Sequence, residues 1–197
     1  MLPSGVTFAT HITLFRILLV PVFAVLAVYY ARSFDSPPPD ERFRWWAVGV
    51  FVLASVLDGV DGYVARRFRQ RSRLGAVLDP LADKLLVLTA VITLSVVQWG
   101  EDWSIPIWFS GLVIAREAVI LGGVAVLHFL GHEVRITPHW SGKAATAFLM
   151  ITLAWVMLKI IPLDPLYPTA GAGVFVVLSG IVYFRKGLRQ LKEHDHD

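Results

Sequence analysis

Apolar runs recur along the chain, each separated from the next by a short polar segment. They cover residues 12–30, 45–57, 85–97, 105–130, 144–161 and 170–184. A helix needs about 20 residues to cross a bilayer, and in lipid only helices and closed barrels satisfy all of their backbone hydrogen bonds. The second and third runs reach that length only if the polar segments 58–66 and 75–83 form their helix ends. The sequence therefore predicts an all-α integral membrane protein with six transmembrane helices, forming a single domain over residues 1–197.

Composition agrees with a membrane protein. Hydrophobic residues make up 56% of the chain and charged residues only 17%, whereas about a quarter of the residues in soluble domains are charged. Cysteine is absent, which excludes disulfides and thiolate metal sites.

Basic residues gather on one predicted side of the membrane. They are Arg66, Arg67, Arg69, Arg71 and Arg73 between the second and third runs, and Arg185, Lys186, Arg189 and Lys192 after the last. Short loops rich in arginine and lysine mark the cytoplasmic side. We therefore expect both termini, the segment 66–73 and the loop with Arg135 in the cytoplasm. Because topology explains these charges, no nucleic-acid partner is expected.

Aspartates punctuate two of the predicted helices. Asp58 and Asp61 are three residues apart, and Asp79 and Asp83 are four apart, so each pair shares one helix face. An ionised carboxylate in a membrane helix costs about 2.5–3.5 kcal/mol on insertion scales and needs a compensating partner. Two such faces brought together make an oxygen-rich cage that suits Mg²⁺ or Mn²⁺ better than zinc.

Small and cationic residues accompany these acids. Gly62, Ala65 and Gly75 fall on the same stripes, where they let a bulky ligand approach the backbone. Arg66 has the planar fork that contacts phosphate oxygens. The stripes suit a lipid-soluble substrate with a charged headgroup.

The residues from Asp58 to Asp83 follow the pattern D-x2-D-G-x2-A-R-x8-G-x3-D-x3-D. This string resembles, position for position, the signature of the CDP-alcohol phosphatidyltransferases. The likeness extends over most of the chain: residues 10–16 followed by Pro21, residues 78–84 and 115–117, and Gly142-Lys143 resemble segments of the members that make phosphatidylglycerophosphate in bacteria, and of the related cardiolipin synthases.

The resemblance implies transfer of a phosphatidyl group from CDP-diacylglycerol to an alcohol, with release of CMP, in the bacterial inner membrane. Asp58, Asp61 and Asp79 would bind two divalent ions, Mg²⁺ or Mn²⁺. Asp83 would complete the metal cage and act as the general base on the acceptor hydroxyl. The residues implied to border the cytidine diphosphate are Gly62, Ala65, Arg66 and Gly75.

One departure concerns the acceptor. The members that use glycerol 3-phosphate typically carry G-K-x-K-T near the fifth helix, whereas this chain has Ala145 in place of the second lysine. Arg116, Arg135 and Lys143 form the predicted anion pocket for the acceptor. Glycerol 3-phosphate is the favoured acceptor, and phosphatidylglycerol, giving cardiolipin, is the alternative.

Other interpretations stay open for several features. A divalent-cation transporter would also carry intramembrane acids, but near the bilayer midplane along a pore, and a catalytically silent membrane scaffold is a further alternative. Arg16 and Lys143 can be explained as cations that snorkel to the membrane surface. Arg116 and Glu117 can form an internal ion pair that lowers the cost of insertion. Gly122 and Gly123 are interpreted as packing contacts or as contacts of a homodimer.

Overall fold

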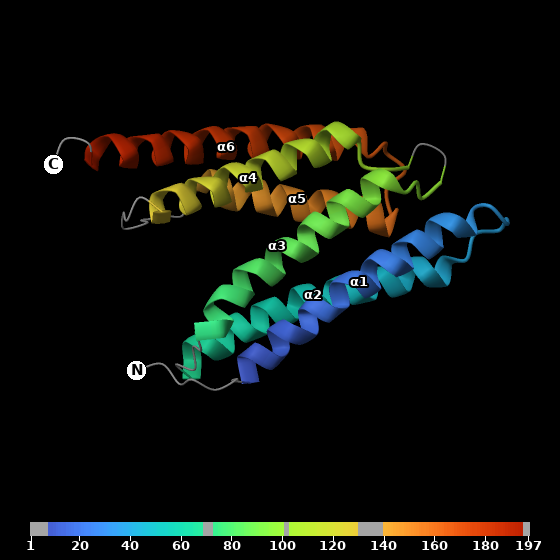
Figure 1. The fold of residues 1–197 in the computed structure, drawn as a ribbon. Coiled ribbons are helices and arrows are strands. Elements are labelled where there is room, and N and C mark those ends of the chain that lie inside the picture. Colours follow the sequence, from blue (N-terminus) through green and yellow to red (C-terminus); the bar gives the residue numbers. More distant parts are fainter. Residues whose placement is uncertain (1–7, 69–72, 101–102, 130–139, 195–197) are drawn as a thin grey trace. The chain divides into compact units, whose positions relative to one another are not determined.

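The protein is described by a computed structural model, which contains helices and no strand in the part of the chain that it describes (Figure 1). The described backbone covers residues 8–68, 73–100, 103–129 and 140–194, with side chains except those at 8–10, 59–68, 73–81, 83, 127, 128 and 191–194. The helices are α1 (Phe8–Ser33), α2 (Glu41–Phe68), α3 (Arg73–Val96), α4 (Ile107–Phe129), α5 (Trp140–Leu158) and α6 (Leu166–His194). The prediction of an all-α fold is confirmed.

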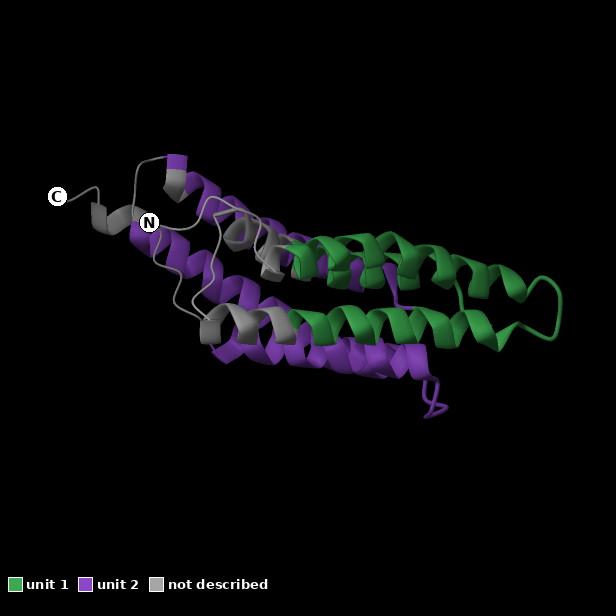
Figure 2. Cartoon of the chain, turned by 90° about the horizontal axis from the view of Figure 1, so that it is seen from below, with its two compact units in different colours: residues 1–104 green, residues 105–197 purple. Residues whose placement is uncertain are grey.

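The helices form two compact units (Figure 2). In unit 1, residues 1–104, α1 packs against both α2 and α3; in unit 2, residues 105–197, α6 packs against α4 and α5. Fully buried alanines such as Ala27 and Ala54 let α1 and α2 approach closely. The expectation of a single domain stays a prediction.

Four helices in the described part of the chain are long and apolar enough to cross a bilayer. The candidate spans are His11–Ser33, Ile107–Val126, Trp140–Leu158 and Leu166–Gln190. In α3 the apolar stretch found within the described side chains is shorter, Lys84–Val96. α2 begins with Glu41, Arg42 and Arg44 and ends in the other signature segment, which lowers its hydropathy. The protein is an integral membrane protein, and a count of six crossings stays a prediction.

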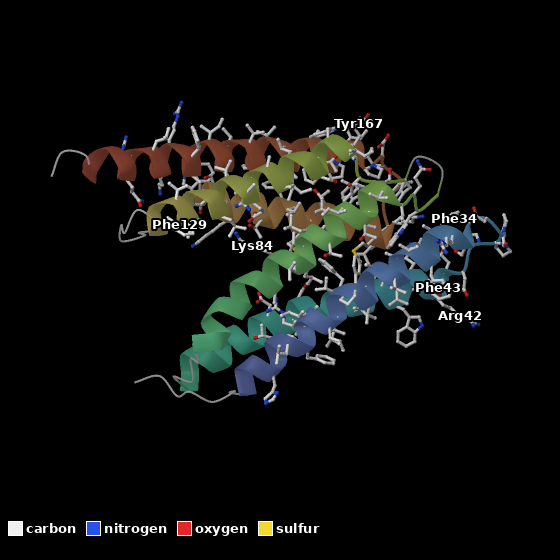
Figure 3. All side chains as sticks on the ribbon, viewed as in Figure 1. Phe34, Arg42, Phe43, Lys84, Phe129 and Tyr167 are labelled. Carbon is white, nitrogen blue, oxygen red and sulfur yellow. The ribbon has the colours of Figure 1, made fainter. Side chains whose placement is uncertain are left out.

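Large apolar side chains on the outer faces of these helices support a lipid environment. Leu18 and Val96 in unit 1, and Phe129 and Ile151 in unit 2, are all exposed. A soluble protein rarely exposes so many such side chains over contiguous surface. Figure 3 shows the side chains of both units, with Phe129 and Tyr167 at opposite ends of unit 2.

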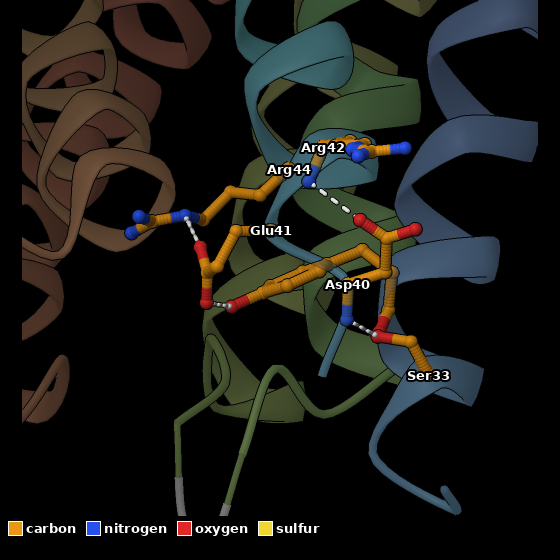
Figure 4. A network of polar contacts seen from close by, with 6 residues as sticks. Ser33, Asp40, Glu41, Arg42 and Arg44 are labelled. Carbon is orange, nitrogen blue, oxygen red and sulfur yellow. Dashed lines mark hydrogen bonds and ion pairs between the residues drawn. The ribbon is translucent and has the colours of Figure 1, made fainter. Parts of the chain in front are cut away.

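A polar network closes the turn between α1 and α2 (Figure 4). Asp40 caps α2, since its Oδ1 accepts the backbone N–H of Arg42 at 3.0 Å. The Glu41 carboxylate is held at both oxygens: Tyr30 Oη donates to Oε1 at 2.9 Å, and Arg44 Nε lies 2.6 Å from Oε2. Trp99 Nε1 donates to the Ala27 carbonyl at 3.2 Å. These hydrogen bonds and this ion pair therefore hold α1, α2 and the segment after α3 together at this end of unit 1.

The turn between α5 and α6 is closed in a similar way. Asp164 caps α6 by accepting the backbone N–H of Leu166 at 2.8 Å. Thr152 Oγ1 on α5 lies 3.2 Å from the Pro168 carbonyl on α6. These contacts set α5 and α6 antiparallel, which brings the beginning of α5 beside the later part of α6.

Gly122 and Gly123 face open space among the described residues. No described atom lies within 4 Å of a Cβ built at either position. The packing interpretation is therefore wrong for the described residues of unit 2, and a homodimer contact stays a prediction.

Candidate active site

The signature residues all lie on helical backbone at one end of unit 1. Asp58, Asp61, Gly62, Ala65 and Arg66 belong to the last part of α2, and Gly75, Asp79 and Asp83 to the first half of α3. Because both segments are helical, the three- and four-residue spacings place each pair of acids on one face, as predicted. α2 and α3 contact each other, and α1 contacts both. This end is opposite the turn that the labelled Phe34, Arg42 and Phe43 surround (Figure 3).

Among the signature side chains, only that of Asp58 is described. For the other signature residues the structure describes the backbone alone; these are Asp61, Gly62, Ala65, Arg66, Gly75, Asp79 and Asp83. Arg135 lies entirely outside the described residues. The meeting of the four carboxylates therefore stays a prediction. Within the described side chains, no group of three or more histidine, aspartate or glutamate residues is placed to hold a metal ion.

Asp58 forms an ion pair with a buried arginine of α1. Arg16 Nη1 lies 2.6 Å from Asp58 Oδ1, and Arg16 Nε donates to the Ala54 carbonyl at 3.1 Å. The Arg16 side chain is 2% exposed, whereas that of Asp58 is 42% exposed. Arg16 therefore contacts two residues one turn apart on α2. Because its side chain is buried, the explanation of Arg16 as a snorkelling cation is wrong.

A pocket of about 530 Å³ opens among the three helices of unit 2. Its lining residues are Arg116 from α4, Gly142, Lys143, Thr146, Ala147 and Met150 from α5, and Tyr183 from α6. Pockets that bind small molecules usually measure about 300–1,000 Å³. The structure thus brings together Arg116 and Lys143, two of the residues predicted to bind the acceptor.

The charge of Arg116 is balanced by its neighbour. Arg116 Nη1 pairs with Glu117 Oε1, and both side chains are mostly buried. Ser179 Oγ of α6 lies 3.4 Å from Arg116 Nε and 3.3 Å from Nη2. The predicted internal ion pair is therefore confirmed, and it coexists with a place on the pocket wall. The exposed Lys143 pairs with no acid among the residues that the structure describes, so it supplies the pocket's uncompensated positive charge.

Gly142 allows Tyr183 to reach the backbone of α5. A Cβ built at Gly142 would lie 2.7 Å from Tyr183 Oη, which is closer than real contacts allow, and 3.1 Å from Cε2, which is tight. The tyrosine hydroxyl therefore forms part of the pocket only because residue 142 has no side chain. Sequence reasoning missed Tyr183, since a tyrosine near the end of an apolar run carries no signal that it lines a pocket.

The two groups of residues differ in chemistry. The signature end of unit 1 supplies carboxylates, which hold hard divalent cations. The unit 2 pocket supplies an ammonium, a guanidinium and hydroxyl groups, which donate hydrogen bonds to an anion such as a phosphate. Each unit is therefore suited to a different kind of ligand.

A protein-family model matches most of the chain. The family model described as CDP-alcohol phosphatidyltransferase matches residues 6–183. This range includes the signature, Arg16 and the whole pocket of unit 2.

Curated relatives agree with that match. The chain is 35% identical over 148 residues to the CDP-diacylglycerol--glycerol-3-phosphate 3-phosphatidyltransferase of Escherichia coli strain K12, which covers 75% of each chain. The proteins of the same name from Escherichia coli O157:H7 and Shigella sonnei have the same identity and coverage.

Proposed function

The chain belongs to the CDP-alcohol phosphatidyltransferase family, and we propose that it transfers the phosphatidyl group of CDP-diacylglycerol to glycerol 3-phosphate, yielding phosphatidylglycerophosphate and CMP. The observation that carries the proposal is the complete signature from Asp58 to Asp83 in a chain similar to relatives named for this reaction. It is an enzyme of phospholipid biosynthesis, and the transporter and scaffold alternatives gain no support from these relatives.

All six helices cross the inner membrane of a bacterium in this proposal, with the active site and both termini in the cytoplasm. The support is the basic segment 66–73 and the basic residues after Phe184, which mark the cytoplasmic side. The Mg²⁺- or Mn²⁺-dependent site then faces the compartment that contains CDP-diacylglycerol headgroups and soluble phosphates.

The signature residues fit a divalent metal by the chemistry of their donor atoms. Asp58, Asp61, Asp79 and Asp83 offer carboxylate oxygens and no sulfur or nitrogen ligand, as Mg²⁺ and Mn²⁺ prefer. The Asp58 carboxylate is 42% exposed and is bound by Arg16 at one oxygen. When bound, two such ions would neutralise charge on the diphosphate and on the departing CMP.

The remaining signature residues act on the two substrates. Asp83 takes the proton of the acceptor hydroxyl as that oxygen attacks the phosphorus bearing the diacylglycerol, and the bond to CMP breaks. Gly62, Ala65 and Gly75 give the cytidine diphosphate close access to the helix backbones. Arg66 donates to its phosphate oxygens.

The unit 2 pocket is proposed to bind the acceptor phosphate through Arg116 and Lys143, with Arg135 as a further donor. Glycerol 3-phosphate is a phosphomonoester with nearly two negative charges, so it needs cationic donors where water is partly excluded. A single domain over residues 1–197 is part of this proposal, and its support is the family model that matches residues 6–183.

Purified protein tests the proposal directly. In nanodiscs with CDP-diacylglycerol and Mg²⁺, addition of glycerol 3-phosphate should release CMP and form phosphatidylglycerophosphate. EDTA should abolish release, and Mg²⁺ or Mn²⁺ should restore it. Conversion of phosphatidylglycerol to cardiolipin without use of glycerol 3-phosphate would assign the alternative acceptor. Absence of CMP release with every acceptor would refute the proposed activity.

A further inference from the structure

Arg16 and Asp58 form an asymmetric pair. The arginine side chain is 2% exposed and the carboxylate 42% exposed, although their closest atoms are 2.6 Å apart. A buried guanidinium is costly unless its charge is compensated. The charge is compensated here by an acid that belongs to the signature.

The guanidinium fixes both the position and the orientation of that acid. Its Nε binds the Ala54 carbonyl and its Nη1 binds Asp58 Oδ1, so two points one turn apart on α2 are held from α1. A planar guanidinium with donors at fixed angles restricts the carboxylate more than a single ammonium would.

A second ion pair of unit 1 shows what a purely structural contact looks like. Glu41 uses both carboxylate oxygens inside the protein, one for Tyr30 Oη and one for Arg44. Asp58 uses Oδ1 for Arg16, and Oδ2 has no partner among the residues that the structure describes. A carboxylate held at one oxygen and open at the other is the usual state of a metal ligand with an outer partner.

We propose that Arg16 is a positioning residue that orients Asp58 so that Oδ2 faces the divalent-metal site. The inference rests on the proposed metal-dependent function. Arg16 touches neither substrate; it acts through Asp58, and it ties the first helix of the protein to the metal-binding end of the second.

The test measures metal binding apart from activity. Free Mn²⁺ is followed by electron paramagnetic resonance during titration of wild-type protein and of the R16Q, R16K and R44Q variants in nanodiscs, and each variant is also melted in EDTA. Loss of an outer partner of a metal ligand typically costs about 10–100-fold in affinity. We expect that loss for R16Q, a smaller one for R16K, which keeps the charge without the fork, and none for R44Q.

A double-mutant cycle shows whether Arg16 acts through Asp58. In the D58N background, R16Q should not weaken Mn²⁺ binding further, because the carboxylate on which Arg16 acts is already absent. Equal Mn²⁺ affinity in wild type, R16Q and R16K, with only lower melting temperatures, would overturn the inference in favour of a structural ion pair. Additive losses would also overturn it. If R16Q does not fold, R16K alone decides. Wild-type protein that binds no Mn²⁺ would refute the metal-dependent function itself, and with it the inference.

Discussion

The two units each contain an arginine that is largely withdrawn from solvent, and the two arginines pair in different ways. In unit 1, Arg16 crosses from α1 to α2 and pairs with an acid of the signature. In unit 2, Arg116 pairs with the adjacent residue, Glu117, and contacts Ser179 on α6. In the first arrangement the arginine orients an acid toward the proposed metal site. In the second, the neighbouring acid neutralises the charge of the arginine.

This difference predicts which kinetic constant each unit controls. Changes at the signature end of unit 1 should affect turnover and metal binding, because its acids surround the reacting phosphates in the proposed function. Changes at the unit 2 pocket should affect the acceptor KM and leave that of CDP-diacylglycerol nearly unchanged. A unit 1 variant that changed only the acceptor KM, or a unit 2 variant that changed turnover and metal binding, would contradict this division of roles.

The largest effect is expected from Asp83→Asn in unit 1. Asparagine keeps the size of the side chain but cannot accept the acceptor proton, and loss of a general base typically lowers the rate about 10²–10⁴-fold. CMP release under saturating substrates measures kcat, and equilibrium binding of a CDP-diacylglycerol analogue should be little changed. A variant with near-wild-type kcat would move the base to another residue.

A smaller effect is expected from Lys143→Met, which keeps much of the aliphatic stem and removes the charge. A hydrogen bond to a charged group contributes about 1.5–3 kcal/mol, so the KM for glycerol 3-phosphate should rise roughly tenfold or more. Arg185→Met is the matched control, because Arg185 is exposed on α6 and does not line the pocket. An equal rise in both variants would indicate general attraction of anions by surface charge.

Arg116 needs a different design because it is tied to Glu117. Arg116→Gln alone would remove the guanidinium that pairs with the mostly buried Glu117 carboxylate, and breaking a buried ion pair is strongly destabilising. The double variant Arg116→Gln, Glu117→Gln removes both charges of the pair at once. Its acceptor KM therefore measures the contribution of Arg116 to acceptor binding with less disturbance of the fold than either single variant.

The sequence predicted the helices well where hydropathy defines them. α2 and α3 include the polar segments 58–66 and 75–83, as the length argument required. α6 continues to His194, beyond the end of the apolar run at Phe184, because hydropathy alone does not register a helix that leaves the apolar region. α5 begins at Trp140, ahead of the apolar run that starts at residue 144.

The contacts between helices could not be predicted in this way. The Arg16–Asp58 pair depends on how α1 is rotated and shifted against α2, which the spacing within either helix does not specify. The place of Tyr183 depends on the close approach of α6 to Gly142 on α5. The signature named Asp58 as a site residue, but only the packed helices identify the residue that holds it.

The smallest effect is expected from Gly142→Ala, which tests whether the unit 2 pocket depends on its shape as well as its charge. The new Cβ would lie 2.7 Å from Tyr183 Oη, and overpacking costs about 1–3 kcal/mol. Because the hydroxyl is the outer end of its side chain and can shift, we expect a loss of stability in the lower part of that range and a small rise in acceptor KM. Gly187→Ala is the control, since no described atom lies within 4 Å of a Cβ built there.

Adding Tyr183→Phe to Gly142→Ala removes the closest atom and should restore much of the acceptor affinity if the clash alone is responsible. If the double variant instead binds the acceptor more weakly than Gly142→Ala, the tyrosine hydroxyl itself contacts the acceptor. The pocket then recognises its ligand through two groups, the ammonium of Lys143 and the phenol of Tyr183.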